Sequence, residues 1–133
     1  MYELMVKGEF AAAHNLRGYR GLCENLHGHN WRVEITLASA GLDKTGMAMD
    51  FKEIKALLRQ VLGELDHVYL NDLPAFAKAN PTTENLARHI AEKLAALLPA
   101  KISVTRAEVW ESERCGAAYI PSAKPRRGAK KKR

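Results

Sequence analysis

The sequence has few of the features that mark secreted or membrane-spanning proteins. It contains only two cysteines, Cys23 and Cys115, which are too few for a disulfide framework. No apolar run approaches the roughly 20 residues that a bilayer-spanning helix needs. The first residues, MYELMVKGEF, lack the basic-then-apolar order of a secretory signal. We therefore expect a cytoplasmic protein that has no membrane association and keeps both thiols reduced.

The body of the chain lacks the positive charge that the whole chain carries. Seven of the 21 basic residues fall within the last eleven positions, which contain no acidic residue. The remainder therefore has 14 basic and 15 acidic residues, a net charge of −1 against +6 for the whole chain. We expect a folded domain over residues 1–121 and a disordered basic tail over 122–133, because the tail has almost no apolar side chains. The tail either only raises solubility or binds nucleic acid weakly and without sequence preference.

Alternation of apolar and polar residues predicts several strands. In the clearest case Trp31, Val33, Ile35 and Leu37 fall on one face, with polar or charged residues between them. Runs of strands joined by tight turns favour an antiparallel sheet. The remaining strands are expected over Glu3–Ala13, Met47–Met49, Ile102–Glu111 and Ala117–Ile120.

Two amphipathic helices are expected beside these strands. Asp50 has the first position of a capping box, and apolar residues follow it at helical spacing. The second helix should begin near Thr82 or Thr83 and end before Pro99. Residues 65–81 have no clear period and predict a long connection, which in a compact domain is often functional. The fold class is therefore α+β, with both helices on one sheet face and the other face solvated or buried against another subunit.

Three histidines have the arrangement of a metal site. His27 and His29 are two residues apart at the entry to a strand, so both imidazoles point to the same face. His14 ends the preceding strand and reaches the same point if the two strands are neighbours. Three neutral imidazoles with an open fourth position form a catalytic zinc site. A His-x-His pair alone is weak evidence, so spacing leaves this assignment undecided.

Cys23 lies four residues before His27 and has three interpretations. It is the fourth ligand of a closed structural zinc site, or a free thiol beside an open zinc, or an inert buried cysteine. In the second case a nearby cation lowers the thiol pKa from roughly 8.5 toward neutrality, which makes the thiol a usable base. Spacing alone does not rank the first two interpretations.

Asp66 and His67 are adjacent at the end of the first helix. An aspartate can fix the tautomer of a histidine and raise its basicity, although this pair could equally be only a helix cap. His89 and Cys115 are interpreted as structural, with His89 expected on the exposed side of the second helix.

Glu111 is unusual for its position in a strand. It shares a face with Ala107 and Val109, which have the character of core positions. A carboxylate on a core face needs a partner. Glu111 is therefore either salt-bridged, the commoner case, or accepts hydrogen bonds from a ligand with paired N–H donors.

Six ordered segments resemble the 6-pyruvoyltetrahydropterin synthase superfamily, and the resemblance extends over about Met5–Tyr119. A set of six is far more specific than any single segment. The three-residue gap between Cys23 and His27 is similar to that of the bacterial 6-carboxytetrahydropterin synthases of queuosine biosynthesis. The segments are FAAAH (10–14), CENLHGHNW (23–31), DF (50–51), LDHVYLND (65–72), PTTENLA (81–87) and the late Glu111.

This resemblance implies a fold, an assembly and a set of site residues. The fold is the tunnelling fold, in which subunits join their sheets into a barrel and trimers stack into a homo-hexamer. The resemblance assigns His14, His27 and His29 to zinc. It makes Cys23 the proton-transferring thiol, supported by Asp66 and His67. It makes Glu111 the residue that binds the pterin, with Thr82 and Thr83 nearby.

The resemblance also implies a reaction on a small-molecule substrate, 7,8-dihydroneopterin triphosphate. The expected products are 6-carboxy-5,6,7,8-tetrahydropterin, acetaldehyde and triphosphate. Arg17 and Arg20 are candidates for the triphosphate, although solvated loop charges are an equal interpretation. One alternative is 6-pyruvoyltetrahydropterin as the product. Another is a nucleic-acid-binding module with a structural zinc, which the body's charge of −1 disfavours. A non-catalytic pterin-binding relative is disfavoured because Cys23, Asp66 and His67 are all present.

Overall fold

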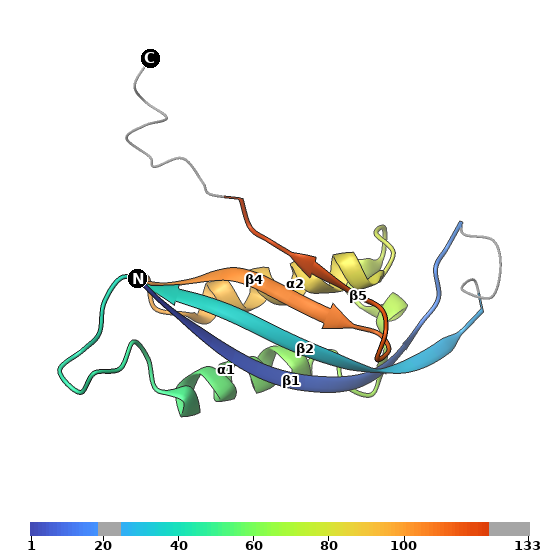
Figure 1. The fold of residues 1–133 in the computed structure, drawn as a ribbon. Coiled ribbons are helices and arrows are strands. Elements are labelled where there is room, and N and C mark those ends of the chain that lie inside the picture. Colours follow the sequence, from blue (N-terminus) through green and yellow to red (C-terminus); the bar gives the residue numbers. More distant parts are fainter. Residues whose placement is uncertain (19–24, 123–133) are drawn as a thin grey trace, which may run out of the picture.

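The computed structural model describes residues 1–18 and 25–122, and the described part forms one sheet and two long helices (Figure 1). The fold class is α+β, as the sequence predicts. Two short 3-10 helices, η2 and η3, lie in the connection between the long helices. In chain order the elements are β1 (Tyr2–His14), β2 (His27–Ser39), α1 (Phe51–Gly63), β3 (Val68–Tyr69), η2 (Leu70–Asp72), η3 (Pro74–Phe76), α2 (Thr83–Leu97), β4 (Ile102–Trp110) and β5 (Gly116–Tyr119).

The five strands have the order β3-β1-β2-β4-β5 across the sheet. β1 and β2 pair antiparallel along their whole length, from Tyr2 opposite Ser39 to His14 opposite His27. β3 adds two residues in parallel beside Ala12 and Ala13. The pairing of β1 with β2 confirms that the two strands with the histidines are neighbours.

The strand predictions differ from the structure in length and in one element. β1 and β2 are longer than expected, because their ladder continues to His14 and His27. The short strand expected over Met47–Met49 is wrong. There the Asp43 carboxylate accepts hydrogen bonds from Thr45 N at 2.8 Å and from Met47 N at 3.1 Å. These bonds fold the segment into a turn, so Met47 does not pair with a strand.

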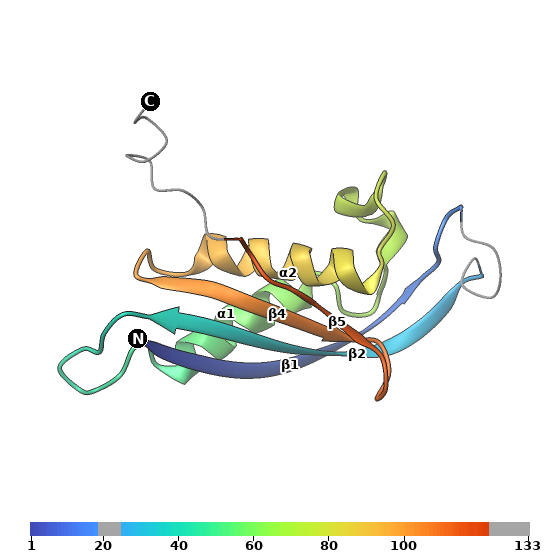
Figure 2. The same ribbon diagram turned by 45° about the horizontal axis from the view of Figure 1, so that its top comes forward.

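Both helices begin where their caps predict. Asp50 Oδ1 accepts a hydrogen bond from Lys52 N at 2.9 Å, and Thr82 Oγ1 accepts one from Asn85 N at 3.0 Å. Each bond satisfies one of the free N–H groups in a first helical turn. The two helices lie on the same side of the sheet, α1 beside β1 and α2 beside β4 (Figures 1 and 2). Neither has the length and hydropathy that a membrane span requires, within the part of the chain described.

The core lies between the sheet and the helices, on the face of the sheet that both helices cover, which we call the inner face. Trp31, Ile35 and Leu37 of β2 are fully buried, as are Ile54 of α1 and Ile90 of α2. The alternation of strand side chains places the apolar residues of β2 on this one face. The apolar face that the sequence predicts is therefore the face that both helices cover.

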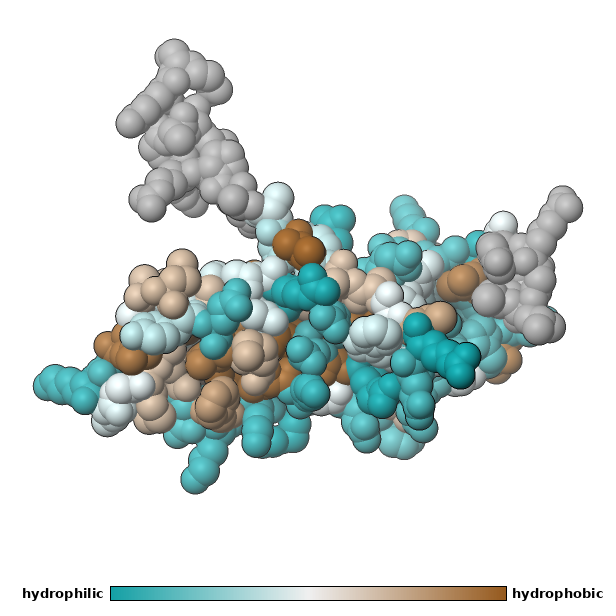
Figure 3. Space-filling model, viewed as in Figure 1, coloured by the Kyte–Doolittle hydropathy of each residue, from teal (hydrophilic) through white to brown (hydrophobic). Residues whose placement is uncertain are grey.

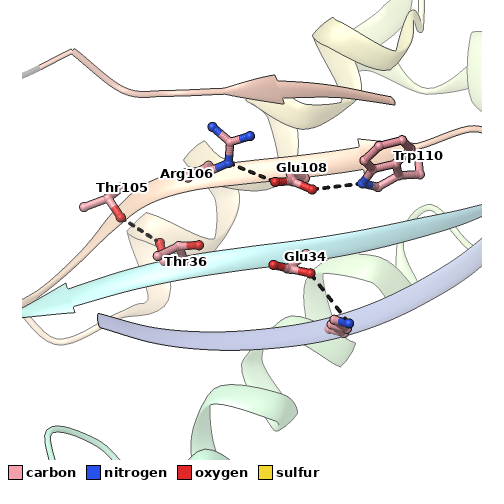
Figure 4. Close-up of polar contacts among 7 residues, drawn as sticks. Glu34, Thr36, Thr105, Arg106, Glu108 and Trp110 are labelled. Atoms are coloured by element: carbon pink, nitrogen blue, oxygen red, sulfur yellow. Dashed lines mark hydrogen bonds and ion pairs between the residues drawn. The ribbon is translucent and has the colours of Figure 1, made fainter. Parts of the chain in front are cut away.

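The outer face of the sheet mixes hydrophilic and hydrophobic residues (Figure 3). Glu108 accepts a hydrogen bond from Arg106 Nε at 2.9 Å and another from Trp110 Nε1 at 2.9 Å (Figure 4). Lys7 and Glu34 form an ion pair across β1 and β2 at 3.8 Å. The face is thus stabilised by its own lateral contacts and carries both signs of charge.

Candidate active site

The three histidines of the sequence prediction meet at one end of the inner face. His14 ends β1 and His27 begins β2 directly opposite it, while His29 lies one alternation further along β2. One ring nitrogen from each histidine lies within 4.8 Å of the others, and His14 Nε2 is 3.0 Å from His27 Nε2. The antiparallel register alone therefore assembles the triad.

Main-chain carbonyls fix the orientation of two of the rings. His14 Nδ1 lies 2.7 Å from Pro81 O, and His27 Nδ1 lies 2.7 Å from Asn25 O. When each Nδ1–H donates to its carbonyl, Nε2 carries a lone pair toward the centre of the triad. His29 Nε2 is buried and has no hydrogen-bond partner within the described ranges. Buried polar atoms are seldom left unpaired, so this donor set fits a metal ion.

Burial keeps two of these histidines neutral. It lowers the pKa of His14, which is 2% exposed, and it lowers the pKa of His29. The charge of Glu111 acts in the opposite direction on both rings. Trp31 packs edge-on against His14 and His29, with ring centroids 5.0 and 4.9 Å away, and forms an apolar floor. Neutral imidazoles are the form that binds metals, so the environment favours ligation.

Glu111 joins the triad from β4. It follows Trp110 at the strand end on the same face as the buried Ala107 and Val109, as the sequence predicts. Thr83 Oγ1 donates a hydrogen bond to Glu111 Oε1 at 2.8 Å. The commoner expectation, a salt bridge, is not what holds this carboxylate: within the described residues its side-chain partner is a neutral hydroxyl. Thr82 caps α2 and so holds Thr83 in the first turn.

Asp66 and His67 form the expected pair, but at the outer edge of β1. His67 Nδ1 is 3.0 Å from Asp66 Oδ2, and Asp66 Oδ1 accepts a hydrogen bond from Ala11 N at 2.9 Å. That backbone bond is the largest cause of the lowered pKa of Asp66. His67 has a φ of 59°, which is uncommon for a residue with a side chain, and its side chain is 79% exposed. His67 and His29 both line a surface pocket of about 530 Å³.

Other sequence predictions have mixed outcomes. Cys23 and Arg20 lie outside the described residues. Arg17 donates to the main-chain carbonyls of Phe76, Ala77 and Ala79, so its guanidinium is bonded within the chain and is not simply a solvated loop charge. His89 is not on an exposed side, because its ring lies 5.3 Å from that of Phe76 and burial lowers its pKa.

The sequence reasoning missed two asparagines near the triad. Asn71 and Asn80 both form hydrogen bonds with the main chain that follows His14. The available signal for Asn71 was its place in the segment LDHVYLND, which carries the family resemblance, whereas Asn80 lies outside the six segments.

Known proteins of one family are similar to this chain. Residues 3–122 match the family model described as 6-pyruvoyl tetrahydropterin synthase. A dihydroneopterin monophosphate aldolase of Pyrococcus furiosus is 34% identical over 113 residues, which cover 85% of this chain and 92% of the relative. A 6-carboxy-5,6,7,8-tetrahydropterin synthase of Synechocystis sp. is 39% identical over 99 residues, covering 71% and 75%. The structure of Caenorhabditis elegans 6-pyruvoyl tetrahydropterin synthase has a TM-score of 0.81 at 27% identity, covering 91% of this chain and 96% of that one.

Proposed function

The chain belongs to the 6-pyruvoyl tetrahydropterin synthase family, and from that membership we propose that it is a zinc-dependent lyase acting on 7,8-dihydroneopterin triphosphate. With one water consumed, the proposed products are 6-carboxy-5,6,7,8-tetrahydropterin, acetaldehyde and triphosphate, a step of queuosine biosynthesis. The observation that supports this proposal best is the meeting of three histidines and one carboxylate on a single sheet face. The name of the Synechocystis relative supports the choice of product.

His14, His27 and His29 would hold the metal ion. A bound zinc ion supplies a positive charge that lowers hydroxyl pKa values and stabilises developing negative charge. The chain's own contribution is to bring one ring nitrogen of each histidine within 4.8 Å of the others. The carbonyl of Pro81 and the packing of Trp31 keep two of those rings from turning away.

Glu111 would bind the pterin. A pterin presents an N–H and an amino group side by side, and a carboxylate can accept from both. Thr83 holds one carboxylate oxygen through its hydroxyl, which fixes the plane of the carboxylate. Thr82 would act only indirectly, by holding Thr83 in place, because its own hydroxyl accepts the capping hydrogen bond of α2 from Asn85 N.

Cys23, Asp66 and His67 would move protons. Cys23 would remove a proton next to the pterin ring as a thiolate. The ionised Asp66 carboxylate holds His67 Nδ1, so Nε2 is the ring atom left to exchange a proton. The unusual backbone of His67 supports this role, because strained conformations concentrate at functional sites.

Two other products have specific support. The structural match to the Caenorhabditis elegans enzyme favours 6-pyruvoyltetrahydropterin from the same triphosphate. The similarity to the Pyrococcus furiosus aldolase, which extends over 92% of that relative, favours a dihydroneopterin monophosphate substrate. A nucleic-acid-binding module with a structural zinc has less support, because Lys7 and Arg106 on the outer face each contact a glutamate.

We also propose that the active form is a homo-hexamer in which sheets join into a barrel. Along residues 2–11 of β1, the edge away from β2 carries no strand partner among the described residues, and a bare strand edge favours pairing with another chain. Sedimentation equilibrium would test this: a monomer at working concentration would contradict it.

One experiment separates the three reactions. The zinc-loaded protein is incubated with dihydroneopterin triphosphate or with the monophosphate, and products are identified by mass. The proposal expects the 6-carboxy product and acetaldehyde from the triphosphate alone. Cys23→Ala should keep zinc and lose most turnover, whereas His27→Ala should lose both. A Cys23→Ala protein that releases the metal would overturn the role of Cys23 as a base.

A further inference from the structure

Asn15 and Arg17 follow β1, and each forms hydrogen bonds with a side-chain amide where a residue of a sheet would bond to a neighbouring strand. Asn71 accepts from Asn15 N at 3.0 Å and donates to Asn15 O at 2.9 Å. Asn80 accepts from Arg17 N at 2.9 Å and donates to Arg17 O at 2.9 Å. Each amide therefore exchanges two hydrogen bonds with one residue, which is the pattern of a paired strand position.

The second of these amides is linked to the histidine triad. Asn80 directly precedes Pro81, and the carbonyl of Pro81 lies 2.7 Å from His14 Nδ1. The two segments are thus joined twice, at His14 with Pro81 and at Arg17 with Asn80. Two linkages between short segments leave the Pro81 carbonyl little freedom to move relative to the ring.

Further bonds make this junction rigid. The guanidinium of Arg17 donates to the carbonyls of Ala77 and Ala79 at 3.3 and 3.2 Å, and its Nε donates to Asn80 Oδ1 at 3.3 Å. Asn85 Nδ2 donates to Asn80 O at 2.8 Å, which ties the segment to the first turn of α2. The loop before Pro81 is therefore connected to both β1 and α2.

We propose that Asn80 is a positioning residue for the metal ligand His14. Its paired bonds with Arg17 hold the Pro81 carbonyl against Nδ1 of the imidazole, which keeps the proton on Nδ1 and directs Nε2 at the metal. Groups that orient a ligating histidine through its second nitrogen raise metal affinity. This inference rests on the proposed metal site, and it assigns a function to the segment over residues 76–81.

The test measures the metal site in the full chain, with cobalt in place of zinc. Asn80→Ala removes all three side-chain bonds to Arg17, and Asn80→Asp keeps the acceptor but loses the donor. Chelator competition gives the metal affinity, and the visible absorption of cobalt reports ligand geometry without any need for turnover. Asp50→Ala is the matched control, because it removes a comparable bond at the start of α1, away from the triad.

We expect Asn80→Ala to weaken cobalt binding about tenfold, the lower end of the range for groups that orient ligands, and to change its absorption spectrum. Asn80→Asp should give a smaller change of the same kind, and it serves alone if the alanine variant does not fold. Asp50→Ala should lower the melting temperature and leave affinity and spectrum unchanged. Wild-type affinity and spectrum in the Asn80 variants, or the same changes in Asp50→Ala, would overturn the inference. A wild-type protein that binds no metal would instead overturn the proposed function.

Discussion

The inner face of the sheet has two ends that differ in chemistry although they share the same strands. Along β2, Val33, Ile35 and Leu37 are buried under the helices, whereas His27 and His29 continue the same alternation beyond them. At the end formed by Val33, Ile35 and Leu37, which we call the core end, the side chains pack against apolar residues of the same chain. At the other, the buried His29 Nε2 has no partner within residues 1–18 and 25–122. A single alternation along β2 therefore builds both core and site. Packing at the core end fixes the positions of His27 and His29 at the other end, which we call the site end.

The largest effect should come from removing a ligand at the site end. His29→Ala should weaken zinc binding by roughly a hundred- to a thousandfold. A structural zinc site with four ligands provides about 10–16 kcal/mol, so one ligand accounts for about 2.5–4 kcal/mol. The melting temperature of the metal-free protein should change little, because within the described residues the buried His29 Nε2 has no hydrogen bond to lose. Equilibrium dialysis with metal analysis would measure the loss. Stoichiometric zinc at wild-type affinity in the variant would exclude His29 as a ligand.

The matching change at the core end is Ile35→Ala. Ile35 is fully buried, so the substitution should lower the free energy of unfolding by about 2–5 kcal/mol. Urea unfolding of the metal-free protein would measure this. Zinc stoichiometry of the folded protein should stay at the wild-type value. If zinc binding fell in proportion to stability, the two ends would not be separable.

Glu111→Gln should weaken pterin binding at the site end. The variant can keep the bond from Thr83 but presents an amide donor where the carboxylate presents an acceptor. We expect weaker binding of a non-reactive pterin by at least ~2 kcal/mol, about thirtyfold, because an unpaired buried group costs roughly 1–3 kcal/mol. Calorimetric titration would measure it. Equal affinity in both proteins would return Glu111 to a structural role.

The smallest effect concerns pH at His89 of α2, which takes no part in the proposed site. Burial lowers the pKa of His89 below its ordinary value of 6.5, Lys93 acts in the same direction, and Glu64 and Glu92 oppose them. The unfolded chain then binds the proton more readily, so this contribution to stability is complete above pH 6.5 and is lost as pH falls through the folded pKa. In metal-free protein, His89→Gln should lose less stability than wild type over this range. Urea unfolding at each pH would show it, and identical slopes would contradict it.

The site could be predicted where it follows from local alternation. The shared face of His27 and His29 comes directly from a period of two, and Glu111 follows from its apolar neighbours Ala107 and Val109. The roles of Asn71 and Asn80 depend on contacts between segments more than 50 residues apart, for which the sequence has no period. The Met47–Met49 prediction failed for a local reason, because the Asp43 side chain bonds to Thr45 N and Met47 N and turns the chain there. The His89 prediction failed because the ring of Phe76, from the connection before α2, lies against the His89 ring.

The pairing of β2 with β4 contains one irregularity. Thr36 is opposite Arg106 while Leu37 is opposite Val104, so Thr105 has no counterpart and donates its hydroxyl to Thr36 O at 3.2 Å (Figure 4). An extra residue of this kind is a β-bulge.

The bulge changes which residues of β4 face the helices. Before it, the even-numbered Ile102 and Val104 face the helices, and after it, the odd-numbered Ala107 and Val109 do so. Glu111 continues the alternation of Ala107 and Val109, and only this register places its carboxylate on the histidine side of the sheet. A strand without the extra residue would turn the same carboxylate to the outer face, so the position of an acidic group at the site depends on a single insertion six residues earlier in the chain.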